Sequence, residues 1–151
     1  MKIKIDDHKF ETDILSSLFS SEAMKTLQDL SIETNISVTD LPMFSAPELV
    51  KFEYQKLKAI PDQILRSLAM YSTKLKEVRL IAPERTGGQV IYFPLRGIEK
   101  VFIRGAFDEL VEILCRNNRN LQSIELQVVP YSGLTAVSMT HLATLEHLTK
   151  I

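Results

Sequence analysis

The chain has 151 residues, of which 45% are hydrophobic and 25% are charged, and its formal net charge is −1 at pH 7. These values are ordinary for one globular domain that is large enough to bury a core. The near-neutral charge gives no electrostatic footprint for nucleic acid, and no apolar run approaches the roughly 18 residues that a membrane span needs. We therefore expect neither nucleic acid nor a membrane among the partners.

A hexapeptide of the form L-x-x-L-x-L recurs along the whole chain. Five copies are nearly complete, and their apolar residues are Leu27, Leu30 and Ile32; Leu49, Phe52 and Tyr54; Leu75, Val78 and Leu80; Ile98, Val101 and Ile103; and Leu121, Ile124 and Leu126. A sixth copy, starting at Leu145 and continuing at Leu148, has Lys150 where the third apolar residue should stand. The six copies start 22, 26, 23, 23 and 24 residues apart, and a weaker seventh copy opens the chain with Met1, Ile3 and Ile5.

Each complete copy predicts a short strand with one buried face, because successive side chains of a strand point to opposite sides. The predicted strands are residues 29–33, 51–55, 77–81, 100–104 and 123–127. We expect them to be parallel neighbours in one curved sheet. The alternative is a set of unrelated buried strands in an α/β sheet, which predicts no fixed phase between strand and helix.

Between the copies the apolar spacing changes to that of helices. In chain order, residues 13–25, 61–72, 107–116 and 134–144 are predicted helices. Residues 37–47 contain two prolines and are expected to be extended or to form a single turn. Residues 82–97 are expected to be a loop followed by an irregular segment.

The strand motif, the helix after it and the variable spacing resemble the leucine-rich repeat family over nearly the whole chain. The segment LVEILCRNNRNLQSIEL (residues 110–126) is most similar to the cysteine-containing repeats of F-box ubiquitin-ligase receptors. No F-box is visible in this chain, because Leu41-Pro42 lies inside the repeats. In regular repeats an asparagine or cysteine three residues past the last strand leucine ties successive turns together, and here only Asn35 fits. The resemblance implies an irregular α/β solenoid with a concave strand face and a convex face of helices and turns, in one domain of about six to seven repeats over residues 1–151.

The residues between the apolar positions are expected on the concave face. Near the middle, Phe102 and Ile81 are apolar where the strand register demands exposure, and Arg79, Lys100 and Arg104 surround them. An aromatic residue among arginines is typical of binding hot spots. The alternative is that a neighbouring side chain covers Phe102 and that the charges are only solvated. The candidate partner-binding residues are Glu53, Glu77, Arg79, Ile81, Lys100, Phe102, Arg104 and Glu125.

No catalytic, metal or cofactor site is expected. His8, His141 and His147 are not spaced as metal ligands, and no phosphate-binding loop spacing occurs. Cys115 is the only cysteine, so no internal disulfide can form, and its place near a helix end favours a buried rather than a reactive thiol. Asp108 stands near a helix start, where a carboxylate stabilises the helix dipole.

The lack of a disulfide and of a secretion signal predicts an intracellular protein, cytoplasmic or nuclear. The chain begins and stops within strand-like runs, so we expect a part of a longer protein, with Leu142, Leu145 and Leu148 exposed in an isolated copy and end-to-end self-association. The expected function is recognition of a protein or peptide on the concave face, as in the substrate-binding region of an F-box-type receptor. The alternatives are a structural or scaffolding subunit, which would use the convex face or an end, and an enzyme.

Overall fold

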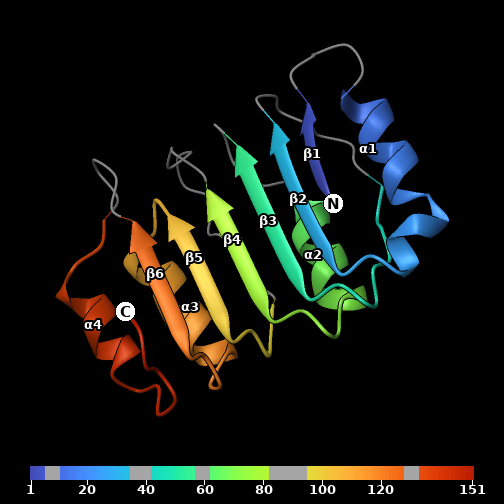
Figure 1. Cartoon of the computed structure of the whole chain (residues 1–151). Helices are drawn as coiled ribbons and strands as arrows, with labels where there is room; N and C mark the ends of the chain where they lie inside the picture. Colours follow the sequence, from blue (N-terminus) through green and yellow to red (C-terminus); the bar gives the residue numbers. More distant parts are fainter. Residues whose placement is uncertain (6–10, 35–41, 57–61, 82–94, 128–132) are drawn as a thin grey trace.

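The computed structural model describes residues 1–5, 11–34, 42–56, 62–81, 95–127 and 133–151. Within these ranges all strands are parallel and form one six-stranded sheet in the order β1-β2-β3-β4-β5-β6 (Figure 1). The strands are β1 (Lys2–Ile5), β2 (Asp29–Thr34), β3 (Lys51–Lys56), β4 (Glu77–Ile81), β5 (Lys100–Arg104) and β6 (Ser123–Gln127). The predicted parallel pairing of the five strands is confirmed, and β1 adds a parallel strand where the weaker upstream copy was predicted.

Helices α2 and α3 lie against one face of this sheet, while α1 and α4 lie at its two ends (Figure 1). The helical elements are α1 (Glu11–Phe19), the short 3-10 helix η1 (Glu22–Lys25), α2 (Asp62–Tyr71), α3 (Asp108–Asn117) and α4 (Ala136–Leu142). We call the face toward α2 and α3 the covered face and the opposite one the open face. The α/β class and the parallel sheet are therefore as predicted. The segment 82–94 and Asn35 lie outside the described residues.

The helix predicted over residues 13–25 is two elements, and two serines explain the break. The Ser20 hydroxyl donates to the backbone oxygen of Ser16 at 2.8 Å, and the Ser21 hydroxyl donates to that of Leu18 at 2.7 Å. Serine side chains that bond to carbonyls one turn back compete with continued helical pairing. The chain therefore leaves α1 at Phe19 and resumes as a single 3-10 turn.

The apolar residues of the repeated hexapeptide build the core on the covered face. Cross-strand register sets them in two ladders: Leu30, Phe52, Val78, Val101 and Ile124, and then Ile32, Tyr54, Leu80, Ile103 and Leu126. All of these side chains are buried except Leu126, which is partly buried against the same core. Burying one such side chain contributes about 1.5–3 kcal/mol, so the ladders dominate the stability of the sheet.

A tight turn precedes β3, β4 and β6, and the turn before β6 contains a buried polar residue, Asn118, that the sequence analysis did not identify. In the last of these turns the backbone N–H of Leu121 donates to the oxygen of Asn118 at 3.1 Å. The side chain of Asn118, only 1% exposed, accepts from the N–H of Ile98 at 2.8 Å. Its amide donates to the backbone oxygens of Leu95 at 3.1 Å and Leu114 at 3.0 Å. Asn118 therefore joins two consecutive copies of the repeat by satisfying buried backbone groups.

A serine on α2 makes a similar connection nearer the N-terminus. The hydroxyl of Ser67 accepts from the N–H of Phe44 at 3.1 Å and donates to the oxygen of Gln63 at 2.7 Å. Ser67 is fully buried. Its hydroxyl therefore joins α2 to the segment before β3, and that segment belongs to the preceding copy of the repeat.

The frame predicted for the sixth copy is wrong by three residues. Lys150 pairs with Ser123 in an isolated parallel bridge. The oxygen of Gln122 accepts from the N–H groups of Thr149 at 2.9 Å and Lys150 at 3.3 Å. The oxygen of Glu99 accepts in the same way from Gln122 at 2.8 Å and Ser123 at 3.1 Å. Thr149 is therefore the equivalent of Gln122, and Lys150 is the equivalent of Ser123.

It follows that Leu148, and not Leu145, corresponds to the first leucine of the preceding copy, Leu121. Lys150 is then an ordinary polar position of the open face rather than a failed core position. The expected exposure of Leu142 and Leu145 is also wrong, because they are 2% and 6% exposed. Leu148 is partly buried against the core.

Candidate functional site

The eight predicted partner-binding residues all lie on β3 to β6 at the positions that alternate with the buried ladders. Three of them, Lys100, Arg104 and Glu125, are exposed. The others, Glu53, Glu77, Arg79, Ile81 and Phe102, are half-buried. Because side chains alternate along a strand, burial of the ladders on the covered face places all eight on the open face.

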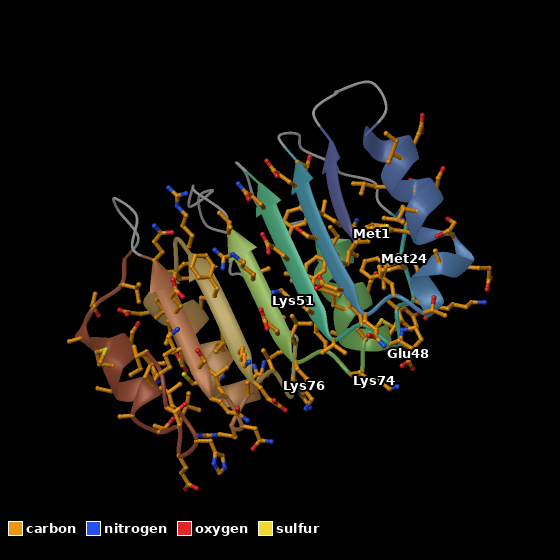
Figure 2. The ribbon with its side chains drawn as sticks, in the orientation of Figure 1. Met1, Met24, Glu48, Lys51, Lys74 and Lys76 are labelled. Atoms are coloured by element: carbon orange, nitrogen blue, oxygen red, sulfur yellow. The ribbon has the colours of Figure 1, made fainter. Side chains whose placement is uncertain are left out.

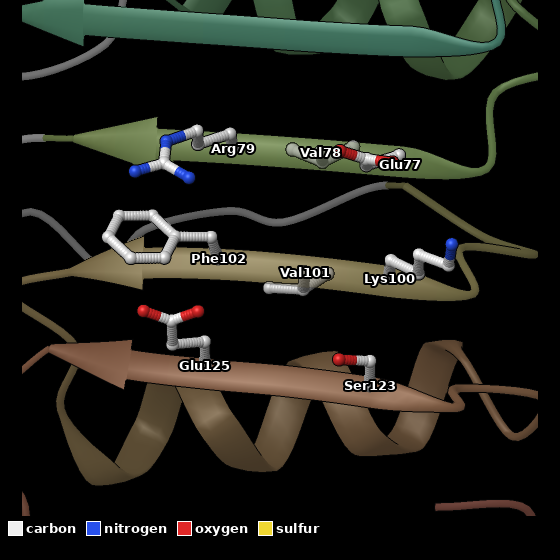
Figure 3. Close-up of a pocket in the computed structure, with 8 residues that line it drawn as sticks. All are labelled: Glu77, Val78, Arg79, Lys100, Val101, Phe102, Ser123 and Glu125. Atoms are coloured by element: carbon white, nitrogen blue, oxygen red, sulfur yellow. The ribbon is translucent and has the colours of Figure 1, made fainter. Parts of the chain in front are cut away.

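Phe102 lies at the centre of a row that crosses four strands. Register aligns Glu53 with Arg79, Arg79 with Phe102, and Phe102 with Glu125. The guanidinium carbon of Arg79 is 3.9 Å from the centre of the Phe102 ring, which is a close cation–π contact. Figure 3 shows Arg79 on one side of the ring and Glu125 on the other. A neighbouring side chain thus covers part of Phe102, while the ring remains half-exposed.

A shallow hollow of about 140 Å3 surrounds this ring on β4, β5 and β6 (Figure 3). Its lining residues are Glu77, Val78, Arg79, Lys100, Val101, Phe102, Ser123 and Glu125. Five of the predicted residues are therefore brought together in one place. Glu53, Ile81 and Arg104 lie outside the lining. The hollow is smaller than the roughly 300–1,000 Å3 typical of small-molecule pockets, and its size suits one side chain of a larger partner.

The charges of the open face fall into two groups. On β3 and β4, Lys51 forms an ion pair with Glu77 at 2.9 Å, and the Nε of Arg79 lies 4.0 Å from the carboxylate of Glu53. The hydrogen bond and the charge of Glu77 raise the pKa of Lys51 above its usual 10.5. These charges neutralise one another within the face.

On β5 and β6 the charges are left without partners. Among the described residues, no ion pair or side-chain hydrogen bond involves Lys100, Arg104 or Glu125. Lys100 and Arg104 stand two residues to either side of Phe102 on the same strand. The part of the open face around Phe102 therefore presents two unpaired cations and one unpaired carboxylate.

Further ion pairs join consecutive copies of the repeat where the strands begin. Lys74 contacts Glu48 at 2.6 Å, and Lys76 contacts Glu99 at 2.8 Å. Figure 2 shows Glu48, Lys74 and Lys76 where the strands begin. Such exposed pairs contribute about 0–1 kcal/mol each, so they suit solubility and register more than binding.

Cys115 and Asp108, for which the sequence suggested no catalytic role, both have structural roles. Cys115 is 2% exposed, which confirms the predicted burial, and burial raises the pKa of its thiol to about 11. Asp108 accepts hydrogen bonds from the N–H of Thr135 at 2.9 Å, from its hydroxyl at 2.5 Å, and from the hydroxyl of Ser138. These bonds lower the pKa of Asp108 to about 2 and tie α3 to α4.

Over the described residues, no group of three or more histidine, cysteine, aspartate or glutamate side chains is placed to hold a metal ion. In the same part of the chain, no helix is both long and apolar enough to cross a bilayer. His8 lies outside the described residues. The site that the described residues offer is thus the charged, aromatic hollow of the open face.

Comparison with known proteins adds no relative to this description. No protein-family profile matches the chain, and neither a curated protein nor a solved structure is detectably similar to it.

Proposed function

We propose that this chain is a leucine-rich repeat protein that recognises another protein through its open face. The repeat assignment is supported by five hexapeptides that each form a strand in the same phase and pair only with their chain neighbours. Asn118 and Ser67 support it further, because buried polar side chains that join consecutive copies suit a stack of repeated units. Each copy leaves its polar strand face uncovered, and such a face is suited to binding an extended surface.

The observation that carries the binding function is the Phe102 hollow. A half-buried aromatic ring with an arginine stacked on it stands in the middle of a largely charged face. Aromatic and arginine side chains are the most frequent anchors of protein interfaces. The hollow lies beside this ring, and a partner side chain entering it would pack against Phe102 and Arg79.

The resemblance of residues 110–126 to F-box receptors supports a more specific context, the substrate-binding region of a ubiquitin-ligase receptor. This context is tested by whether the full-length protein carries an F-box and copurifies with the other ligase subunits. Failure of that test would leave protein recognition in place and remove the ligase context.

Protein recognition itself is tested by affinity capture with quantitative mass spectrometry, comparing three forms of the chain. The forms are the wild type, Phe102→Ala, and Tyr71→Ala as a control that truncates an aromatic residue of α2, 39% exposed. We expect at least one partner to be retained by Tyr71→Ala and lost by Phe102→Ala. Partners that bind all three forms equally would place recognition elsewhere.

A second candidate function, that of a structural subunit, is favoured by an apolar hollow beside α4. This hollow of about 240 Å3 is lined by Met139, Leu142, Ala143, Leu145, Leu148 and Ile151. Val137 and Met139 on α4 are 51% and 55% exposed. Light scattering should then show concentration-dependent association of the 151-residue chain that Met139→Glu abolishes. A monomer at every concentration would remove this candidate.

A further inference from the structure

The unpaired charges around Phe102 specify what kind of segment the open face can hold. Lys100 and Arg104 are both exposed, both free of partners, and both on β5. A buried interface tolerates such cations only when the partner supplies opposite charge, because desolvating an unpaired charge is unfavourable. The partner must therefore bring carboxylates to these two positions.

The spacing of the two cations fixes the spacing of the carboxylates. Lys100 and Arg104 are four residues apart on one strand, which is about 13 Å at roughly 3.3 Å per residue. A partner segment in extended form has the same rise, and its residues i, i+2 and i+4 share one face. Acidic residues at i and i+4 of a segment that lies along β5 would therefore reach both cations together.

The position between them must be apolar. Phe102 stands midway between Lys100 and Arg104, and its ring is the apolar side chain at the centre of the hollow. Glu125 is unpaired and flanks the ring from β6, so an acidic side chain at the middle position would meet like charge. The hollow of about 140 Å3 accommodates an aliphatic side chain at this position.

We infer that the open face binds an extended protein segment of the pattern acidic-x-apolar-x-acidic, aligned along β5 with its apolar residue against Phe102. This inference rests on the proposed recognition function and specifies its partner. The neutralised charges of β3 and β4 set the limit of the site on one side, because Lys51, Glu77, Glu53 and Arg79 already face one another.

The first experiment measures binding of defined peptides by fluorescence anisotropy at low salt. The probe is a nonapeptide with Glu-Ser-Leu-Ser-Glu at its centre. The controls are a peptide of the same composition with adjacent glutamates and a Lys-Ser-Leu-Ser-Lys peptide. We expect the probe to bind at least tenfold more tightly than either control. Equal binding of the probe and the rearranged peptide would overturn the spacing, and preference for the basic peptide would overturn the charge.

A charge swap separates specific pairing from general attraction. Lys100→Glu/Arg104→Glu should abolish binding of the acidic peptide and create binding of the basic peptide. The matched control, Lys25→Glu/Arg119→Glu, makes the same change in net charge at exposed residues of η1 and of the turn before β6. This control should leave acidic-peptide binding within about twofold. Equal losses in both double variants would overturn the inference.

Selection from a displayed library of random nonapeptides distinguishes failure of this inference from failure of the proposed function. Clones that need Phe102, as judged by counter-selection on Phe102→Ala, should carry the acidic pair at i and i+4. Phe102-dependent clones without that pair would refute the inference and leave the recognition function intact. No Phe102-dependent clone at all would refute both.

Discussion

The two faces of the sheet use alternate residues of the same strands and differ in almost every physical respect. On the covered face the ladders of β2 to β6 are apolar and, apart from the partly buried Leu126, shielded from water. On the open face they are charged, with neighbours paired on β3 and β4 and unpaired on β5. Two phenylalanines mark the difference, since Phe52 is fully buried and Phe102 is half-exposed. Stability therefore resides in one face, and the capacity to recognise a partner resides in the other.

The strongest test of this division is Phe52→Ala. Phe52 is fully buried and packs near Tyr54, with ring centres 6.3 Å apart. Truncating a buried phenylalanine lowers the free energy of unfolding by about 3–5 kcal/mol, because transfer free energy is lost and a cavity remains. Urea unfolding followed by circular dichroism measures the change. A loss below about 1 kcal/mol would show that the covered face is not the source of stability.

A somewhat smaller loss is expected for Asn118→Ala, which removes polar rather than apolar contacts of the covered side. The N–H of Ile98 and the oxygen of Leu95 would be left buried without this partner. Each unsatisfied buried group costs about 1–3 kcal/mol, so we expect a total loss of about 2–4 kcal/mol. Asn120→Ala, at an exposed position two residues away, is the matched control and should change stability by less than about 0.5 kcal/mol. Equal effects of the two substitutions would contradict a linking role for Asn118.

Phe102→Ala should separate the two faces most clearly. The substitution removes a half-exposed ring and its contact with Arg79, so stability should fall by less than about 1 kcal/mol. Binding of the acidic peptide should weaken at least tenfold. Thermal melting and anisotropy on the same sample measure both quantities. A stability loss comparable to that of Phe52→Ala would place Phe102 in the core and remove the division.

The smallest effect is expected where the open face neutralises its own charge. Lys51→Met removes the pair with Glu77, which is solvent-screened and worth about 0–1 kcal/mol. The pKa of Lys51 is raised above 10.5, so its contribution is present at neutral pH and is lost as the pH rises through that raised value. Unfolding at pH 7 with and without 1 M salt, about 3 Å of screening length, should show that salt removes most of the difference. Undiminished destabilisation at high salt would indicate a packing role instead.

The strands could be predicted from the sequence because an alternation of apolar and polar residues is unambiguous when the two faces of a strand differ so strongly in polarity. It failed at the sixth copy, where Leu142, Leu145, Leu148 and Ile151 recur every three residues. Such a run matches the leucine spacing in more than one frame, and only the backbone bond from Thr149 to Gln122 selects the right one. Apolar periodicity alone carries no information that distinguishes these frames.

The hydrogen bonds by which Asn118 joins two copies could not be predicted from the sequence, for a different reason. The residue expected to join copies was sought three residues past the last leucine of each strand, whereas Asn118 stands three residues before the start of its motif at Leu121. Its partners, Ile98 and Leu95, belong to the preceding copy, and a single-copy pattern does not identify them. On the open face, the register that follows from the spacing did place Arg79 beside Phe102. Which charges find partners depends on side-chain conformation, which the spacing does not determine.

The chain-order pairing of the strands also has a consequence for how the protein forms. Lys51 pairs with Glu77, Glu77 with Lys100, and Lys100 with Ser123, which are 26, 23 and 23 residues apart. Each described strand pairs only with the strand before or after it in the chain. During synthesis, β2 and β3 can therefore pair as soon as both have left the ribosome, and each later strand is added to a preformed edge. Folding from the N-terminus onward leaves a single growing edge exposed at any moment, which shortens the time in which unpaired strands of different molecules can meet.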